Sequence, residues 1–316
     1  MGNSGLFPAC LSGSRTRLPR NAYRLQEGRC DSTGLIDSVA ALLFSNETTA
    51  VRILLIGDIV GEPGRRIVQQ CVPVLREQRS LDLVIANAEN AAAGSGVTPA
   101  IYQALIDAGV DGITLGDHVY RKKEIGKTLE KQPNIIRPAN FPASAPGSGS
   151  MLLPTKNGAA VGVFSLLGRV FMRPVDCPFT AADRVLSEFP DDVHVRILDF
   201  HAEATSDMQV MGRYLDGRVS AVLGTHTHVA TADEQIFSGG TAFQCDVGMT
   251  GPHLSILGRR IDRVVETTIR FWPTPFDVAS EDVRLHGTIV EVDPARGCAL
   301  SIERLAVTEK AAREGA

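Results

Sequence analysis

At 316 residues, with 44% hydrophobic and 22% charged residues, the chain has the length and composition of an ordinary globular protein of one large or two modest domains. Its net charge of −4 disfavours a protein that coats nucleic acid, and no run reaches the roughly 18 apolar residues that a membrane span needs. The six cysteines form no Cys-x-x-Cys pair, so they indicate indifferent thiols of a reducing cytosol rather than a disulfide framework or a zinc ribbon.

Residues 1–50 differ in composition from the rest of the chain. Four arginines precede the first acidic residue, Glu27, and Gly, Ser, Asn and Thr are common. The segment lacks the apolar core of a secretory signal and any clear amphipathic period. We therefore expect a disordered or marginally ordered extension, with one short helix over residues 35–44. Because a GTG valine codon can start bacterial translation, a further hypothesis is that translation begins at Val51.

From residue 51 onward, short apolar runs alternate with helical patterns. Strands that are apolar almost throughout are buried on both faces, and their alternation with helices predicts a largely parallel sheet in an α/β fold. The apolar runs are residues 51–58, 81–86, 112–117, 159–167, 193–200 and 219–223. The helical patterns are residues 63–79, 98–109, 122–131 and 205–215. Thr98 and Pro99 are a typical N-cap and first helical residue.

The C-terminal third of the chain shows fewer helical patterns. Strands are predicted over residues 241–246, 264–271, 287–292 and 299–305, and the turn Asp293–Gly297 predicts a hairpin between the last two. These strands favour a second, more antiparallel sheet packed beside the first. Residues 51–307 are then one domain, and residues 308–316 are a tail with a frayed or short helical end.

Residues that can bind metal follow five of the apolar runs. In α/β folds, ligands bind beyond the carboxyl ends of the strands. Each residue taken alone could be a turn or capping residue, but their joint occurrence at five strand exits makes that interpretation weak. By contrast, His194 and His286 are expected to be structural, and His253 stays open. The strand-exit residues are Asp58, Glu89, Asn90, Asp117, His118, His201, His226 and His228.

Imidazole nitrogens together with carboxylate oxygens suit divalent Fe, Mn, Zn or Co. Two such ions roughly 3.5–4 Å apart can share a carboxylate, clamp a phosphoryl centre and activate a bridging water as nucleophile. His226 and His228 are two residues apart, so they point to opposite faces in an extended chain but can straddle a metal pair at a turn.

Over residues 51–307 these motifs resemble the YmdB-like branch of the calcineurin-type metallophosphoesterases. The matching segments are Asp58–Arg65, Ala86–Ala91, Gly116–His118, Arg137–Asn140, Asp199–Ser206, Gly224–Glu234 and Asp246–Pro252. The resemblance implies a bacterial cytoplasmic phosphodiesterase that acts on 2′,3′-cyclic nucleotides and has a four-layer α/β/β/α sandwich. It also implies two divalent metal ions, iron first and manganese as a replacement, and a homo-oligomer. A link to RNA metabolism and no association with membranes are implied as well.

The family's roles carry over residue by residue. One metal would be held by Asp58, Glu89, Asn90 and His228, and the other by Glu89, Asp117, His201 and His226, with Glu89 bridging. The resemblance gives His118 the role of general acid, which would protonate the departing 2′ oxygen and leave a 3′-phosphorylated nucleotide.

One position departs from the family pattern. The third strand exit reads Gly-Asp117-His118, where the family has Gly-Asn-His, so an additional carboxylate joins the ligand set. Tighter metal binding and a less Lewis-acidic centre are expected from the extra negative charge. Val119 and Tyr120 also replace the usual Thr-Trp. Two alternatives therefore stay open: a phosphoesterase that acts on another ester, and a regulatory protein that binds phosphate ligands with low turnover.

Overall fold

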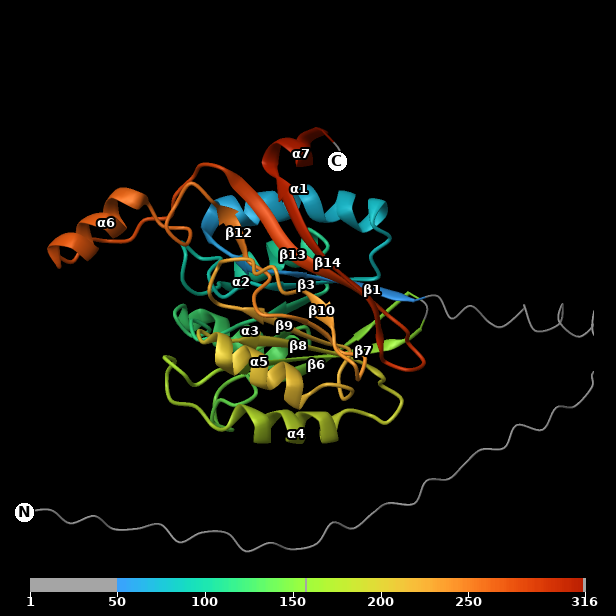
Figure 1. The fold of residues 1–316 in the computed structure, drawn as a ribbon. Helices are drawn as coiled ribbons and strands as arrows, with labels where there is room; N and C mark the ends of the chain where they lie inside the picture. Colours follow the sequence, from blue (N-terminus) through green and yellow to red (C-terminus); the bar gives the residue numbers. More distant parts are fainter. Residues whose placement is uncertain (1–49, 157, 315–316) are drawn as a thin grey trace, which may run out of the picture. The chain divides into compact units, whose positions relative to one another are not determined.

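The computed structural model describes residues 50–156 and 158–314, and Figure 1 shows their fold. The extension predicted for residues 1–50 lies outside the described residues except for Ala50, as does its short helix, and the proposed start at Val51 stays a hypothesis. Among the described helices, none is both long enough and apolar enough to cross a membrane.

Within the described residues, eight strands form the first sheet. They are β1 (Val51–Ile56), β2 (Asp58–Ile59), β3 (Leu83–Asn87), β4 (Gly112–Thr114), β5 (Ile135–Ile136), β12 (Met249–Pro252), β13 (Val283–Val292) and β14 (Ala299–Thr308). Their order is β2-β12-β13-β1-β3-β4-β5, with β14 paired to the other side of β13. Strands β1, β3, β4 and β5 run parallel, whereas β13 pairs antiparallel with β1, β12 and β14.

The second sheet has six strands in the described part of the chain. They are β6 (Ser150–Pro154), β7 (Ala160–Leu167), β8 (Val195–His201), β9 (Ala221–Thr225), β10 (Gln235–Ile236) and β11 (Ala242–Gln244). Their order is β10-β11-β9-β8-β7-β6. The central strands β7, β8, β9 and β11 are parallel, and the two edge strands are antiparallel.

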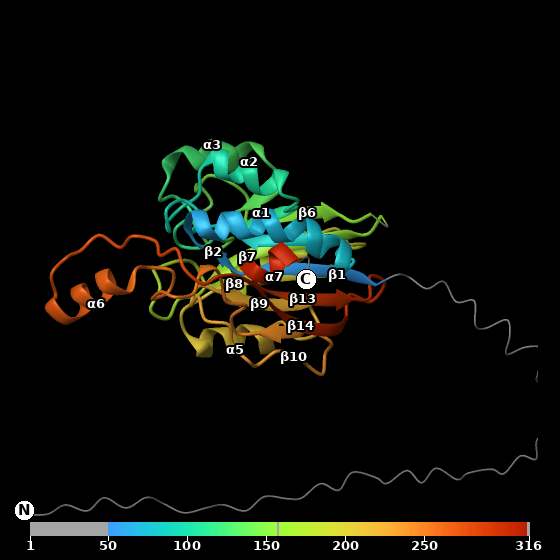
Figure 2. The same ribbon diagram turned by 90° about the horizontal axis from the view of Figure 1, so that it is seen from above.

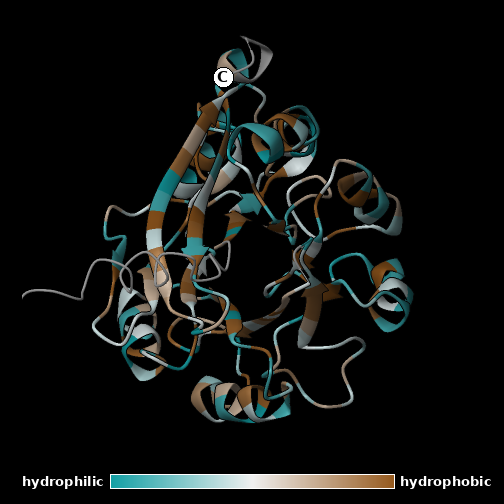
Figure 3. Ribbon diagram, turned by 90° about the vertical axis from the view of Figure 1, so that its right-hand side faces the viewer, coloured by the Kyte–Doolittle hydropathy of each residue, from teal (hydrophilic) through white to brown (hydrophobic). Residues whose placement is uncertain are grey.

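Helices cover the outer face of each sheet, as Figures 1 and 2 show. On the first sheet lie α1 (Gly61–Gln78), α2 (Pro99–Asp107) and α3 (Gly126–Lys131), and α7 (Glu309–Glu314) packs beside α1. On the second sheet lie α4 (Pro178–Glu188) and α5 (Thr205–Tyr214). The expected four-layer α/β/β/α sandwich is therefore confirmed. In Figure 3 these helices carry apolar and polar segments side by side, as expected for elements with one buried face.

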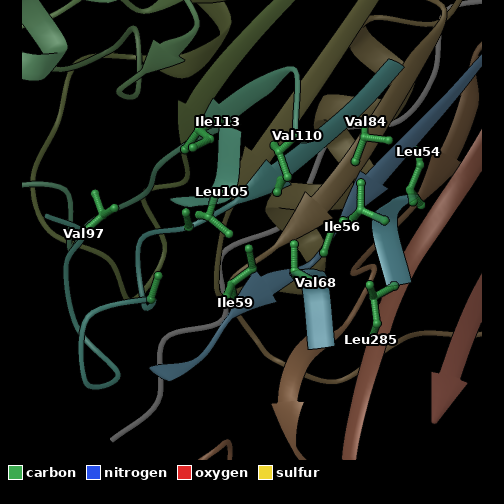
Figure 4. Packing of buried hydrophobic residues seen from close by; sticks show 14 of the residues in the cluster. Leu54, Ile56, Ile59, Val68, Val84, Val97, Leu105, Val110, Ile113 and Leu285 are labelled. Atoms are coloured by element: carbon green, nitrogen blue, oxygen red, sulfur yellow. The ribbon is translucent and has the colours of Figure 1, made fainter. Parts of the chain in front are cut away.

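Three apolar clusters occupy the three interfaces between the layers. Strand β1 contributes to two of them, because successive side chains of a strand point to opposite faces. Leu54 and Ile56 face the helices of the first layer, where Figure 4 shows Val68 of α1 close to Ile56. Ile53 and Leu55 face the second sheet. Each fully buried side chain of this size contributes roughly 1.5–3 kcal/mol of transfer free energy, so β1 is held firmly at the centre of the sandwich.

Most of the predicted elements are confirmed. Helix α1 buries Ile67, Cys71 and Leu75 at helical spacing, and Thr98 caps α2 by accepting a hydrogen bond from the Ile101 amide at 3.3 Å. The hairpin of β13 and β14 is also present, and α7 gives the tail its short helical end. Helix α4 was not predicted, although Pro178 at its first turn is a start signal.

The strand predicted over residues 264–271 is wrong, because α6 (Ile261–Arg270) occupies that segment. Its β-branched residues suggested a strand, but its apolar side chains follow helical spacing. Asp262 in the first turn and Arg270 in the last turn complement the helix dipole. The segment also lies away from both sheets, where no strand is available as a partner (Figures 1 and 2).

The two sheets do not divide by strand direction as expected. The first sheet is mixed because the C-terminal hairpin joins it instead of forming a separate antiparallel sheet. The second sheet is mixed because its two edge strands are antiparallel to their neighbours. Val51 of β1 pairs with Val292 of β13 across almost the whole chain. Local sequence patterns carry no information on such a distant pairing.

His253, which directly follows β12, packs against His286 of β13. The rings of His253 and His286 have centroids 4.4 Å apart. Among the described residues, no hydrogen-bond partner is found for either ring nitrogen of His286 or for Nε2 of His253. Burial, the neighbouring His253 and Arg284 lower the pKa of His286 to about 4, although Asp282 acts in the opposite direction. The neutral ring is therefore the form that the fold favours.

This pKa predicts a loss of stability in mild acid. The unfolded chain binds a proton at His286 near pH 6.5, but the native chain binds it only near pH 4, so stability falls as pH drops through this window. We expect the His286→Gln variant to lose about 1 kcal/mol less than the wild type between pH 7 and pH 5, after allowance for solvent screening. Urea unfolding at both pH values measures this, with His194→Gln at an exposed position as control. Equal pH dependence of all three proteins would contradict the prediction.

Candidate metal centre

The eight strand-exit residues converge on one edge of the sandwich. Asp58 lies in β2 directly after β1, Glu89 and Asn90 follow β3, and Asp117 and His118 follow β4. From the second sheet, His201 ends β8, while His226 and His228 follow β9. The parallel strands of both sheets thus bring their carboxyl ends to the same place. Asp58, Glu89 and His201 are completely buried there.

Four of these residues form a compact cluster of metal-binding atoms. One ligand atom each from Glu89, Asp117, His201 and His226 lies within 4.8 Å of all the others. Nε2 of His201 is 3.2 Å from Oε1 of Glu89 and 3.4 Å from Oδ1 of Asp117. Nδ1 of His226 is 3.0 Å from Nε2 of His201. All four donors therefore face a common point.

A second group adjoins the cluster through Glu89. Nε2 of His228 lies 3.6 Å from Oδ1 of Asp58. The amide nitrogen of Asn90 lies 3.2 Å from Oδ1 of Asp58, 3.2 Å from Nε2 of His228 and 3.3 Å from Oε1 of Glu89. The amide oxygen of Asn90 faces Nδ1 of His118 at 2.8 Å. Metal binding through that oxygen would require the amide to rotate. Asp58 and His228 already direct Oδ1 and Nε2 toward each other, so an ion between them could contact both atoms.

Each of the three candidate histidine ligands is held at its far nitrogen. Nδ1 of His201 lies 2.8 Å from Oγ1 of Thr225, Nε2 of His226 lies 3.0 Å from Oε2 of Glu203, and Nδ1 of His228 lies 3.1 Å from the carbonyl of Leu257. A histidine that donates its far N–H to an acceptor presents the lone pair of its other nitrogen to a cation. In all three, that other nitrogen points into the cluster.

A buried polar network supports His201 from behind. Thr225 donates its hydroxyl proton to Oδ1 of Asp199 at 2.6 Å and can therefore accept one from His201. Oδ2 of Asp199 accepts hydrogen bonds from Asn87 at 3.1 Å and from Thr114 at 2.5 Å. Burial raises the pKa of Asp199, while the charge of His201 and the hydroxyl donors Thr114 and Thr225 act against that change. The network fixes the ring of His201 and thereby its metal-facing nitrogen.

The turn that carries His226 and His228 has an unusual backbone. Both residues have positive φ values, 106° and 63°, which are uncommon for residues other than glycine and concentrate at functional sites. Asp246 holds the turn by accepting hydrogen bonds from the amide and the hydroxyl of Thr227, both at 2.8 Å. Burial, and after it the charge of Asp58, raises the pKa of Asp246 to about 7. The two histidines therefore straddle the cluster from a turn and do not point to opposite faces of an extended strand.

The electrostatics of the cluster favour positive charge. Burial would raise the pKa of Asp58, yet the charges of His228 and His201 lower it below its usual range. Asp117 behaves in the same way, and His201 is the first group that lowers its pKa. In return, Glu89 raises the pKa of His201 despite burial. Protons on histidines thus balance the buried carboxylates, and divalent cations would displace these protons and serve the same purpose.

The donor set fits divalent cations. It combines imidazole nitrogens with carboxylate and amide oxygens, which are the ligands of borderline divalent metals. Oδ1 of Asp117 is buried and has no hydrogen-bond partner in the described part of the chain, although it faces His201 and His226. A bound cation would satisfy this oxygen. Asp117 thus places a negative donor directly in the cluster.

Comparison with known proteins identifies the family. Residues 54–305 match the family model described as YmdB-like protein. The 2′,3′-cyclic-nucleotide 2′-phosphodiesterase of Bacillus subtilis (strain 168) is 44% identical over 259 residues, which are 82% of this chain and 98% of that protein. The chain belongs to the YmdB-like family.

Two solved structures are similar to most of this chain. A hypothetical protein from Thermus thermophilus has a crystal structure that matches 82% of this chain and 100% of its own, with 40% identity and a TM-score of 0.78. A structure described as a novel phosphatase from Mycoplasma pneumoniae matches 82% of this chain and 94% of its own, with 30% identity and a TM-score of 0.77.

Several residues of this YmdB-like site were not predicted from sequence. Asn87, Asp199, Glu203, Thr225 and Asp246 support the candidate ligands from behind, as described above. A signal existed for Asp199, because it lies two residues before His201 in an apolar strand and so shares its face. His253 packs against His286 and does not line the cavity at the cluster.

The cavity at the cluster measures about 340 Å³, within the usual range for small-ligand sites. Glu89, Asn90, His118, His226 and His228 lie on its polar side. A second cavity of about 450 Å³ begins at Asp117 and is lined further by Tyr120, Arg121 and Arg173. A phosphate ester could therefore reach the candidate metal ligands and His118 together.

A substitution at Gly116 can test whether the close approach of His201 and Glu89 is essential for metal binding. A Cβ atom at this position would lie 2.3 Å from Nε2 of His201 and 2.4 Å from Oε2 of Glu89, so a side chain here must displace two candidate ligands. We expect Gly116→Ala to weaken metal binding by about tenfold or more, as changes that disturb ligand orientation do.

The measurement is metal content after dialysis against a chelator series, with circular dichroism as a check on folding. Gly126→Ala is the matched control, because a Cβ atom there meets nothing within 4 Å. Equal metal retention by the two variants would contradict the proposed cluster.

Proposed function

We propose that this chain is a dinuclear metal-dependent phosphodiesterase that hydrolyses 2′,3′-cyclic nucleotides to 3′-nucleotides. The observation that carries the proposal is the pair of donor groups that share Glu89. Glu89, Asp117, His201 and His226 form one group, and Asp58, Asn90 and His228 adjoin it. The proposed substrate follows the name of the Bacillus subtilis relative.

The assignment of ligands is part of this proposal. Asp58, Asn90 and His228 would hold one ion, Asp117, His201 and His226 would hold the other, and Glu89 would bridge. Two divalent ions would supply positive charge at the phosphate and lower the pKa of water. The histidines held at their far nitrogens, and the unpartnered oxygen of Asp117, support this assignment. Iron, with manganese as a replacement, stays a prediction, as do a homo-oligomer, a cytoplasmic location and a partner from RNA metabolism.

The surroundings of His118 support its proposed role in proton transfer. Its Nδ1 lies 2.8 Å from Oδ1 of Asn90, and its backbone amide donates to Oε2 of Glu89 at 2.9 Å. If the Asn90 amide turns its oxygen to a metal, Oε1 of Glu89, 3.4 Å from Nδ1, can hold the ring instead. Nε2, which lies 3.7 Å from Oδ2 of Asp117, would then be the proton-donating atom. The side chain is 27% exposed and lines the cavity. As the bond between phosphorus and the 2′ oxygen breaks, His118 would protonate that oxygen.

A substrate panel tests the proposed reaction. The protein loaded with Mn²⁺ or Fe²⁺ should hydrolyse 2′,3′-cyclic AMP to 3′-AMP faster than it hydrolyses 3′,5′-cyclic AMP or p-nitrophenyl phosphate. Metal analysis of the same samples should find two ions per chain. Two bound ions without hydrolysis of any ester would favour a phosphate-binding regulatory role, and a preference for p-nitrophenyl phosphate would favour a phosphatase.

The role of His118 can be tested through the leaving group. We expect His118→Ala to lower kcat for 2′,3′-cyclic AMP by about 100-fold or more, because the 2′ alkoxide needs a proton to depart. The loss should be much smaller for bis(p-nitrophenyl) phosphate, since p-nitrophenolate is stable without one.

Metal content should stay unchanged in this variant, and His194→Ala serves as a control at an exposed position. An equal loss with both substrates would assign His118 to positioning of the phosphate instead of proton transfer.

A further inference from the structure

The segment between β12 and β13 forms an apolar wall beside the candidate metal centre. It contains α6, which has no buried residue and extends away from the sheets in Figures 1 and 2. Four apolar side chains of this segment line the same cavity as His118 and the candidate ligands; they are Ile256, Leu257, Val264 and Phe276. Leu257 is 51% and Phe276 45% exposed. Large apolar side chains that stay exposed inside a cavity indicate a binding surface.

Hydrogen bonds fix this wall relative to the metal centre. Arg259 donates to the carbonyls of Ala93 and Gly94, which follow the loop that carries Glu89. The same guanidinium donates to the carbonyl of Phe276 at 3.0 Å. The carbonyl of Leu257 accepts the hydrogen bond that orients His228. The position of the wall is therefore fixed relative to the candidate metal ligands, although α6 itself protrudes.

The cavity thus joins two chemically different sides. One side offers carboxylate and imidazole groups that suit a metal-bound phosphate, and the other offers three aliphatic side chains and one aromatic ring. A ligand that fits both must carry a phosphate and an apolar, preferably planar, group a short distance apart. A nucleotide has this composition, and a nucleobase presents a flat π face for which an aromatic side chain is a good partner.

We propose that the wall formed by Ile256, Leu257, Val264 and Phe276 binds the nucleobase of the substrate, with Phe276 as the aromatic partner. This inference rests on the proposed function, since it assumes a nucleotide at the metal centre. None of the four side chains can donate or accept a hydrogen bond. The wall therefore holds purine and pyrimidine bases by contact and stacking, with little discrimination among them.

Binding measurements separate the wall from the metal centre. In calorimetry with the Mn²⁺-loaded full chain, we expect Phe276→Ala to weaken 3′-AMP binding about tenfold while inorganic phosphate changes by less than about twofold. Phe276→Tyr, which keeps the ring, should restore 3′-AMP binding. Ile269→Ala is the matched control, because this α6 residue is 72% exposed and does not line the cavity.

The outcomes distinguish this inference from the proposed function. If Phe276→Ala weakened the binding of 3′-AMP and of phosphate equally, or weakened neither, the proposed role of the wall in binding the base would be overturned. A change of subunit assembly in sedimentation, with unchanged 3′-AMP binding, would assign the wall to a second copy of the chain and also overturn the inference. Selective weakening of 3′-AMP in a protein that hydrolyses no cyclic nucleotide would support the wall and refute only the reaction.

Discussion

The structure depends on the burial of several carboxylates at one point between two sheets. Asp58 and Glu89 are completely buried, and Asp117 adds a third carboxylate close to them. Such a concentration of negative charge is strongly unfavourable in a protein interior unless positive charge compensates it. Protonated histidines can compensate in part, and the raised pKa values of His201 and His228 show that they are drawn into this role. Divalent cations compensate more completely, and the arrangement of the polar side chains is consistent with their presence.

Both sheets are needed to bring the buried carboxylates and the histidines together at one point. Each sheet alone supplies only part of the cluster: the first contributes Asp58, Glu89, Asn90 and Asp117, and the second contributes His201, His226 and His228. The oxygen donors therefore come from one sheet and the imidazoles from the other. Packing of the two sheets through their shared apolar interface brings the two ligand types together. The stability of that interface and the geometry of the metal centre are consequently linked.

Support for the centre extends well behind the candidate ligands. Asp199 acts through Thr225 on His201, Asp246 acts through Thr227 on the turn between the histidines, and Leu257 holds His228. Because the last of these contacts comes from the segment that carries α6, the same segment that orients a candidate ligand also forms the apolar side of the cavity. This segment would therefore take part both in orienting a metal ligand and in holding the organic part of a substrate.

The four-layer fold was implied by the resemblance to a known family, whereas the sequence by itself determined the alternation of strands and helices and the eight residues at the strand exits. These depend on local rules: apolar runs form buried strands, and functional side chains collect at strand ends. Only the tertiary structure decided that β13 inserts beside β1 and that Asp199 and Asp246 support the histidines. Each of these depends on contacts between segments far apart in the chain, and a local pattern contains no information about which distant segment will be the partner.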